Sequence, residues 1–259
     1  MGGKGLSPAL ITDGLETQFV GQRVIYYPRL ASTMEVARRQ ARRGAAWGTV
    51  VIAGEQTAGK GRLGRVWLSP EGSLALSIIL YPSLAYLPSL IMLAALAVVH
   101  SIEAVTGLKA QVKWPNDVLV NGRKVCGILI ESDVQGDTVV YAIIGIGVNV
   151  NLRLSDFPEI SSLATSLSDE LGRDVSLLNL IRRLLVEVEG LYLALLAGGS
   201  IYEEWRGSLV TLGKKVWVES GKNKYEGIAE SVASDGSLLL RQANGSLIRI
   251  VAGDVTLRD

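Results

Sequence analysis

The sequence QVKWPNDVLVNGRKVCGILIES, residues 111–132, decides the fold class. Two apolar, β-branched runs flank Asn121-Gly122, a dipeptide typical of a two-residue hairpin turn. The stretch therefore predicts a strand, a tight turn and an antiparallel strand. A parallel α/β sheet joins its strands through crossover helices, so a hairpin at this point argues against that class.

Outward from this hairpin, strands and helices are mixed without a regular alternation. Apolar or alternating runs predict strands at residues 23–27, 49–54, 73–80 and 138–151. Helices are expected from a capping box at Ser32-Thr-Met-Glu35 to about Arg43, over residues 89–105, and from a Ser176 cap through Leu196. We therefore expect an α+β fold with a mixed β-sheet flanked by helices.

The two ends of the chain differ from this central part. The first 22 residues are polar and rich in glycine, and we expect them to form a loose lead-in. After Trp205 the chain contains only short alternating runs, separated by the turn signals Asp235-Gly236 and Asn244-Gly245. This pattern predicts a main domain over residues 1–207 and a small all-β domain over residues 208–259, close to the lower size limit for independent folding.

The composition excludes several classes of protein. The 259 residues include 26 Lys and Arg against 25 Asp and Glu, so no global positive field attracts nucleic acid or anionic membrane. The single cysteine, Cys126, cannot form an internal disulfide and fits a reducing cytoplasm, and no Cys/His cluster is present for a metal. Residues 72–102 lack Asp, Glu, Lys and Arg, but Pro82 and Pro88 divide them into pieces too short to span a bilayer. We expect a cytoplasmic protein without membrane or nucleic-acid partners.

The sequence GEQTAGKGRLGRVW, residues 54–67, resembles two nucleotide-binding motifs and fits neither. A P-loop needs Ser or Thr directly after its lysine, and a glycine follows Lys60 here. A dinucleotide fingerprint needs an acidic residue about 20 positions later, and residues 79–90 contain none. The glycines nevertheless free backbone N–H groups to line up on an anion, while Arg62 and Arg65 add positive charge. A flexible basic surface loop is the alternative interpretation.

Several motifs in order resemble those of the biotin protein ligase family. They are QTAGKGRLGRVW, KWPNDVLVNGRKVCGILIE and GIGVNVN, and the likeness extends from about Gly21 to the C-terminal module. It implies a catalytic fold related to class II aminoacyl-tRNA synthetases, followed by an SH3-like β-barrel. The sequence departs from the family at Met34, where Asn is usual, and at Lys60, which replaces an Arg and loses its bidentate geometry.

The resemblance implies a two-step ligase reaction. The biotin carboxylate attacks the α-phosphate of Mg-ATP, which gives biotinyl-5'-AMP and pyrophosphate. A lysine of a biotin carboxyl carrier protein, a carboxylase component, then attacks the mixed anhydride. The implied ligands are biotin, ATP and Mg²⁺, and family members often form homodimers.

Three other functions remain open from the sequence. A lipoate–protein ligase shares the fold and chemistry, although the KWPND and GKGR motifs favour biotin. A bifunctional ligase and transcriptional repressor carries an N-terminal helix-turn-helix, and the roughly 20 residues before the core lack its two amphipathic helices. A non-catalytic biotin-binding module would not need ATP. We expect no sequence-specific DNA binding by this chain.

The resemblance also implies roles for individual residues. Arg62 and Lys113 would be catalytic, because they stabilise charge on the reacting carboxylate and the α-phosphate. The implied biotin site comprises Ser32, Thr33, Met34, Gln56, Lys60, Gly61, Arg62, Lys124 and Gly127. The implied ATP site comprises Arg62, Arg65, Trp67, Lys113, Asn116 and Asn149. No residue is implied as a metal ligand.

Some of these residues have structural alternatives. The capping box explains Ser32 without a ligand, and a turn after proline explains Asn116. Lys124 also suits the charged flank of the hairpin. We interpret His100, in the apolar helix, and Cys126, between apolar strand residues, as core or helix-end residues outside the mechanism.

Overall fold

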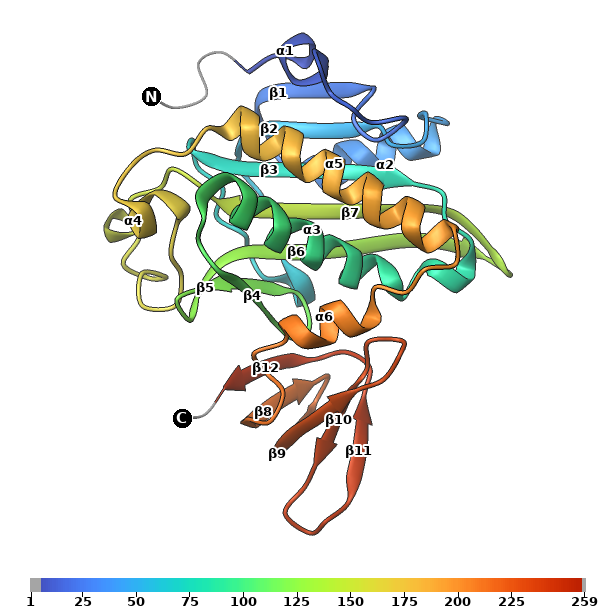
Figure 1. Ribbon diagram of the computed structural model, residues 1–259, viewed down its shortest axis with the longest axis vertical. Coiled ribbons are helices and arrows are strands. Elements are labelled where there is room, and N and C mark those ends of the chain that lie inside the picture. The colour runs from blue at the N-terminus through green and yellow to red at the C-terminus, as the bar shows by residue number, and fades with distance from the viewer. Residues whose placement is uncertain (1–5, 258–259) are drawn as a thin grey trace.

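In the computed structural model, which describes residues 6–257, a large mixed sheet lies beside a smaller antiparallel sheet (Figure 1). The large sheet has the strand order β1-β2-β3-β7-β6-β5-β4. Its strands are β1 (Val24–Leu30), β2 (Val50–Gln56), β3 (Ser73–Leu80), β4 (Ala110–Lys113), β5 (Asp117–Val120), β6 (Arg123–Gln135) and β7 (Thr138–Asn149). β1 and β2 are parallel and the other neighbours are antiparallel, which confirms the predicted mixed sheet.

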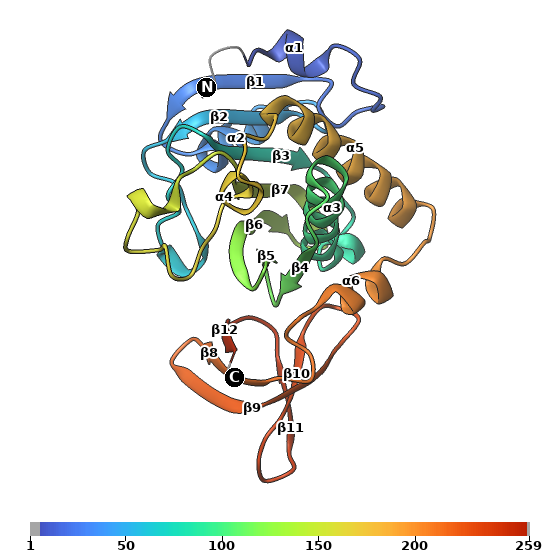
Figure 2. The same ribbon diagram turned by 60° about the vertical axis from the view of Figure 1, so that its left-hand side comes forward.

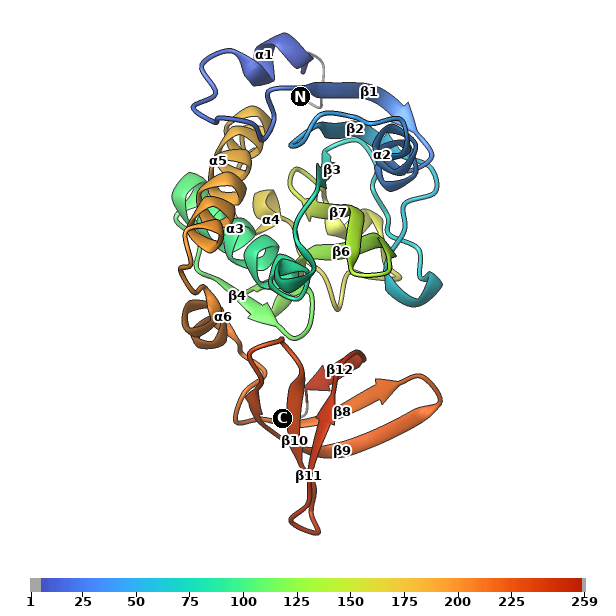
Figure 3. The ribbon, with the colours of Figure 1, turned by 90° about the vertical axis from the view of Figure 1, so that its right-hand side faces the viewer.

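Helices cover both faces of this sheet. α2 (Thr33–Arg42) packs on one face, while α3 (Ser89–Thr106) and α5 (Leu177–Leu196) lie on the other (Figure 2). α6 (Tyr202–Ser208) leads from α5 into the smaller sheet (Figure 3). The remaining helices are α1 (Pro8–Thr12), α4 (Leu167–Leu171) and the 3₁₀ turns η1 (Arg62–Gly64), η2 (Leu84–Tyr86) and η3 (Leu154–Asp156).

The hairpin that decided the fold class forms as predicted. Asn121 and Gly122 join β5 to β6, and both have positive φ, 50° and 76°. A type I′ turn requires positive φ at both central residues, which glycine adopts freely and asparagine tolerates. The turn therefore fixes the antiparallel register in which Val120 faces Arg123.

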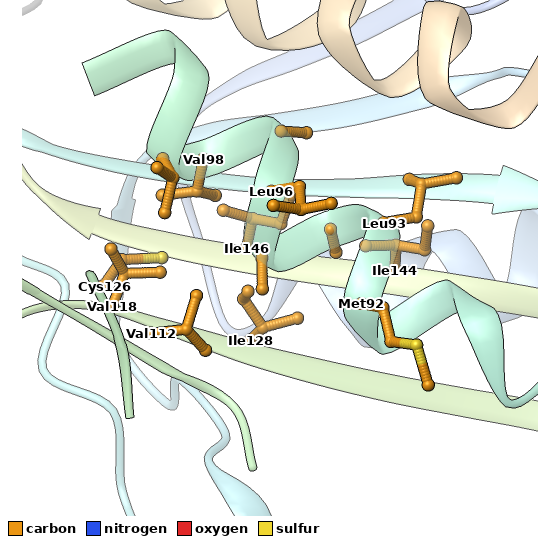
Figure 4. Close-up of a cluster of buried hydrophobic side chains, with 14 of the residues drawn as sticks. Met92, Leu93, Leu96, Val98, Val112, Val118, Cys126, Ile128, Ile144 and Ile146 are labelled. Atoms are coloured by element: carbon orange, nitrogen blue, oxygen red, sulfur yellow. The ribbon is translucent and has the colours of Figure 1, made fainter. Parts of the chain in front are cut away.

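α3 is the central helix of the core. Met92, Leu93 and Leu96 lie over the apolar residues of β6 and β7 that point to this face (Figure 4). By length and composition alone α3 is apolar enough to cross a membrane, but 61% of it is buried inside the fold. The predicted buried helix at residues 89–105 is confirmed.

The N-terminal lead-in was expected to be loose, and for residues 6–22 this is wrong. Ile11 and Val20 are fully buried. The carboxylate of Glu189, on α5, accepts hydrogen bonds from the backbone N–H groups of Gln18 (2.5 Å), Phe19 (2.8 Å) and Val20 (2.8 Å). No local pattern could reveal this, because the partner lies about 170 residues away in the sequence. Residues 1–5 lie outside the described residues.

Glu189→Gln is expected to lower the free energy of unfolding by about 1–3 kcal/mol. The amide keeps one oxygen acceptor but turns an NH₂ group toward backbone donors that the carboxylate now satisfies. Urea unfolding followed by circular dichroism measures the change. Glu203→Gln, at an exposed position on α6, is the control and should change stability by less than about 0.5 kcal/mol. Equal effects of the two changes would contradict this role of Glu189.

The C-terminal region is all-β, as predicted. Its strands are β8 (Lys215–Ser220), β9 (Asn223–Val232), β10 (Leu238–Arg241), β11 (Leu247–Ile250) and β12 (Asp254–Leu257), in the order β11-β10-β9-β8-β12. Within the described chain, the end strands β11 and β12 do not pair with each other, so the sheet is open and the predicted barrel is not confirmed. The indole Nε1 of Trp114 donates to the Gly236 carbonyl at 2.8 Å and ties this sheet to the large one.

Candidate active site

A cavity of about 40 Å³ lies on the face of the large sheet that α2 covers. Many residues predicted to bind biotin or ATP line it: Ser32, Thr33, Met34, Gln56, Lys60, Trp67, Asn116 and Gly127. Others do not form its wall: Gly61, Arg62, Arg65, Lys113, Lys124 and Asn149. The structure therefore brings the first group together directly, and the second group must be placed through its contacts.

Ser32 begins α2, but the predicted capping box is wrong. Its side chain makes no capping hydrogen bond, and Glu35 pairs with Lys60 (2.6 Å) instead of reaching back. The cap comes from β2, where Gln56 Oε1 accepts from the backbone N–H (2.8 Å) and the hydroxyl (3.1 Å) of Thr33. Ser32 Oγ is left buried without a hydrogen-bond partner in the described structure. A buried, unsatisfied hydroxyl in a cavity wall is free to bond to a group that enters the cavity.

Ser32→Ala is expected to leave the free energy of unfolding unchanged within about 0.5 kcal/mol, because the hydroxyl has no partner to lose. If this hydroxyl binds biotin, as the resemblance implies, the same change should raise the KM for biotin up to about tenfold, the cost of one neutral hydrogen bond. Urea unfolding and adenylate kinetics measure the two effects. Ser176→Ala is the matched control: its hydroxyl caps α5 through Asn179 N–H (3.3 Å), so its loss should cost about 1 kcal/mol of stability and leave KM unchanged.

Glycines form the floor of the cavity beneath two large side chains. A Cβ atom on Gly147 would lie 2.4 Å from Trp67 Nε1, and one on Gly127 would lie 3.0 Å from the same indole ring. A Cβ atom on Gly145 would lie 2.5 Å from the sulfur of Met34. The side chains of Met34 and Trp67 therefore lie directly on the β7 glycines Gly145 and Gly147. Met34 therefore acts as an apolar wall of the cavity.

The glycine-rich loop closes on itself. Gly61 N–H donates to the Arg65 carbonyl (2.8 Å), and Trp67 N–H donates to the Gly59 carbonyl (2.9 Å). The N–H groups of the loop glycines were expected to line up on an anion, and in this conformation that of Gly61 is bonded within the loop. Only the single 3₁₀ turn η1 forms here, so no helix opens after the glycines. The dinucleotide motif requires a helix that begins at its last glycine, and the loop does not have that geometry.

Arg62 connects the loop to the cavity and to the C-terminal sheet. Its Nη1 donates to Asn116 Oδ1 at 2.9 Å and to the Gly253 carbonyl at 3.3 Å. Asn116 in turn donates to the Ile128 carbonyl (2.8 Å), which holds its side chain in the cavity wall. Burial lowers the pKa of Arg62, and Asp254 and Asp117 oppose the shift. Arg62 remains charged, because an arginine pKa lies far above neutral pH.

Asp254, on β12, is a site residue that sequence reasoning missed. Its carboxylate pairs with Arg65 at 2.6 Å and lies 3.9 Å from Arg62. No local motif marks it, since its importance depends on how the C-terminal sheet packs against the loop. The structure therefore places Asp254, near the C-terminus, against the basic loop of residues 54–67.

Lys113 and Lys124 add further positive charge around Asp117. Lys113 ends β4, and burial lowers its pKa while Asp117 opposes the shift. No hydrogen bond or salt bridge holds its amine among the described residues. Lys124 Nζ pairs with Asp117 at 2.6 Å and lies 5.4 Å from the Trp67 ring centroid. Asp117 is a second acidic residue that the sequence reasoning did not assign.

The remaining predicted residues have structural roles in this conformation. Asn149 is buried, and its side chain donates to the Thr165 carbonyl at 3.0 Å, away from the cavity wall. His100 contacts the carboxylates of Glu187 (3.0 Å) and Glu204 (2.8 Å) between helices, outside the cavity. Cys126 is fully buried, and burial raises the pKa of its thiol, so it is unreactive as expected. Among the described residues no group of three His, Cys, Asp or Glu side chains is placed to hold a metal.

Comparisons with known proteins agree with this geometry. Residues 26–149 match the family described as "Biotin/lipoate A/B protein ligase family", and residues 211–258 match "Biotin protein ligase C terminal domain". A Bacillus subtilis relative named bifunctional ligase/repressor BirA is 38% identical over 97% of this chain and 79% of its own length. The biotin--[acetyl-CoA-carboxylase] ligase of Paracoccus denitrificans is 34% identical over 78% of this chain and 86% of its own.

Solved structures show the same likeness. The biotin protein ligase of Aquifex aeolicus in complex with biotin and ATP is 30% identical, with a TM-score of 0.78 over 92% of this chain and 99% of that one. The Leishmania major biotin protein ligase in complex with biotinyl-5-AMP is 26% identical, with a TM-score of 0.60 over 89% and 99% of the two chains. The chain therefore belongs to the biotin/lipoate A/B protein ligase family.

Proposed function

We propose that this chain is an ATP-dependent biotin–protein ligase, which forms biotinyl-5'-AMP and transfers biotin to a lysine of a biotin carboxyl carrier protein. One observation supports this most directly: a cavity with an unpartnered hydroxyl, Ser32 Oγ, is joined through Asn116 to the half-buried cation Arg62. Such a site offers neutral hydrogen-bonding groups and positive charge together. A neutral polar ring that carries a carboxylate fits both.

The polar end of the cavity would hold the ureido ring of biotin. Ser32 has a free hydroxyl, and Ser77 donates to the Thr33 hydroxyl at 2.8 Å, which orients that group. Gln56 Oε1 accepts hydrogen bonds from Thr33, and its Nε2 would donate to the ring. Met34 would pack against the apolar part of the ligand, which distinguishes this chain from relatives with Asn at that position.

The cationic end would bring two anions together. A biotin carboxylate oxygen attacks the α-phosphorus of ATP, and the bond to pyrophosphate breaks. Arg62 and Lys113 would reduce repulsion between the carboxylate and the phosphate and stabilise the charge that develops on the phosphorus. In the second step the acceptor lysine attacks the acyl carbon and AMP leaves.

Mg²⁺ would enter with ATP. The described residues contain no cluster of acidic side chains suited to hold it, and Mg²⁺ commonly takes most of its ligands from substrate phosphates and water. When bound, the ion supplies charge neutralisation for the leaving pyrophosphate.

The cavity is smaller than a typical ligand site as the side chains now lie. Its volume of about 40 Å³ is far below the roughly 300–1,000 Å³ typical of ligand sites. The Trp67 indole and Lys60 occupy its wall from the loop side. We expect the loop to lift Trp67 from Gly127 and Gly147 when biotin enters.

We also propose the finer features of the resemblance. The division at residues 207 and 208, and an SH3-like character of the second domain, are supported by the five antiparallel strands from Lys215 onward. A homodimer is supported by the open edge of β6, because β5 pairs only with Arg123–Gly127 and leaves residues 129–135 without a strand on that side in the described structure. A cytoplasmic location agrees with a single, buried Cys126.

The proposed function is tested by incubating the chain with biotin, Mg-ATP and a biotin carboxyl carrier domain. Mass spectrometry of the acceptor lysine should show the added mass of biotin only when ATP is present. A parallel reaction with lipoate separates the two ligase activities. Preferential transfer of lipoate would establish the alternative, and labelling that does not depend on ATP would contradict a ligase.

A further inference from the structure

A basic groove of about 610 Å³ lies between β1 and α2, outside the cavity. Its charged wall residues are Arg29, Arg38, Arg39, Arg42 and one acid, Glu35. The chain as a whole is nearly neutral, with a formal net charge of +1. The positive charge is therefore concentrated here by the fold.

The arginines reach the groove because α2 is amphipathic. Val36, Ala37 and Ala41 are buried against the sheet, so the intervening arginines point away from it. β1 is an edge strand and contributes Arg29 and Tyr27 to the facing wall. β1 and α2 thus form the two walls of the groove.

Half of these arginines already have partners within the chain. Arg29 pairs with Glu55 at 3.2 Å, and Arg38 pairs with Glu131. Arg39 and Arg42 are exposed and make no hydrogen bond or salt bridge to any described residue. The single acid of the groove, Glu35, is itself paired with Lys60. Arg39 and Arg42 are therefore the two arginines of the groove without an ion-pair partner among the described residues.

The groove is continuous with the candidate active site. Ser32 lines both the groove and the cavity. Glu35, in the groove wall, holds Lys60 of the glycine-rich loop at 2.6 Å. A partner seated in the groove would therefore touch the edge of the cavity and the residue that anchors the loop.

We propose that this groove docks an acidic face of the acceptor protein, so that its lysine is presented to the active site. This inference rests on the proposed function, which requires a protein substrate. Arginine forms bidentate hydrogen bonds with carboxylates, and exposed charges of opposite sign accelerate and orient encounter. A groove open to solvent and adjacent to the cavity fits a folded protein that must bind and leave in each cycle.

The test is charge reversal of the two unpaired arginines. In Arg39→Glu/Arg42→Glu, the KM for a carrier domain should rise about tenfold at low ionic strength, with kcat nearly unchanged. The increase should shrink at high salt, because exposed charges are screened. Formation of biotinyl-5'-AMP without carrier should stay within about twofold of the unmodified chain, which also shows that the variant is folded.

Two further variants serve as controls. Arg43→Glu/Lys109→Glu makes the same change in net charge at exposed positions outside the groove, and should leave the KM for carrier unchanged. Arg39→Lys/Arg42→Lys keeps the charge and should recover most of the carrier affinity.

The outcomes separate the docking surface from the proposed function. If the unmodified chain forms adenylate but the groove variant raises the carrier KM no more than its control, the groove is not the docking surface. If the groove variant instead loses binding to a DNA or RNA fragment while its carrier KM stays the same, the groove serves nucleic acid and the proposal is overturned. If the unmodified chain forms no adenylate, the proposed function itself fails.

Discussion

Replacing both Arg62 and Lys113 with alanine is expected to slow pyrophosphate release from biotin and ATP by about 100- to 1,000-fold. Both cations are partly withdrawn from solvent, and burial lowers the pKa of each. Removing them would leave a carboxylate and a phosphate to approach with little to offset their repulsion. The chemistry needs no covalent attachment to a side chain, so most of the rate enhancement must come from such charge stabilisation and from positioning.

The single variants show whether the two residues act as a unit. If they stabilise the same developing charge, Arg62→Ala and Lys113→Ala should each cause much of the loss, and the double variant little more. Pyrophosphate release under single-turnover conditions measures the adenylation step alone. Undiminished release in the double variant would overturn these assignments.

Lys113→Arg keeps the positive charge at this position, so the pH dependence of its adenylation rate serves as a control. Burial lowers the pKa of Lys113, so this lysine loses its proton at a lower pH than an exposed lysine does. Adenylation that depends on the charged form should therefore fall as pH rises through that lowered pKa. An arginine keeps its charge there, so Lys113→Arg should extend activity to higher pH even if its maximum rate is lower.

Local sequence patterns predicted the elements that local interactions determine. The hairpin at Asn121-Gly122 and the buried helix α3 formed as expected, because turn conformation and apolar periodicity are encoded over a few residues. The resemblance assigned Ser32, Gln56 and Asn116 to one site, and in the structure they line the same cavity. Ser32 lies at the α2 N-terminus, Gln56 on β2 and Asn116 between β4 and β5, so spacing alone could not have assembled them.

The errors all involve partners that are distant in sequence. The capping box failed because Gln56, on β2, satisfies the start of α2 in place of Ser32 and Glu35. The lead-in is held by Glu189, on α5. Asp254 was missed because nothing near it in the sequence indicates that it faces the glycine-rich loop. Predicting these contacts requires knowledge of which elements the fold brings side by side.

Asp254→Arg is expected to lower kcat/KM for adenylation by about 10- to 100-fold. Asp254 now pairs with Arg65 (2.6 Å) and lies 3.9 Å from Arg62. An arginine there would place a third positive charge against both, and like charges in close contact cost several kcal/mol. The expected loss in rate corresponds to about 1.4–2.7 kcal/mol of transition-state stabilisation. Steady-state rates of pyrophosphate release measure it.

Two further variants separate the effect of the charge at position 254 from effects of packing in the C-terminal sheet. Asp254→Asn keeps the shape and removes the ion pair, while the Arg62 bond to the Gly253 carbonyl does not depend on this side chain. We expect Asp254→Asn to lose only a few-fold, chiefly through a higher KM. Glu230→Arg reverses an exposed charge in the same sheet, on β9, and should leave kcat/KM unchanged. Equal effects of Asp254→Arg and Glu230→Arg would contradict a specific contact with the loop.

The charge-swapped pair Arg65→Asp/Asp254→Arg tests whether the contact itself holds the loop. If Asp254 acts only by anchoring Arg65, the swap restores the ion pair and should recover much of the rate lost in Asp254→Arg. If Asp254 instead acts by balancing the charge of Arg62 and Lys113, the swap leaves an arginine beside both and the rate stays low. Either result would make the C-terminal sheet part of the adenylation site, because in both cases a residue of β12 would control the cations that we propose to act on the phosphate.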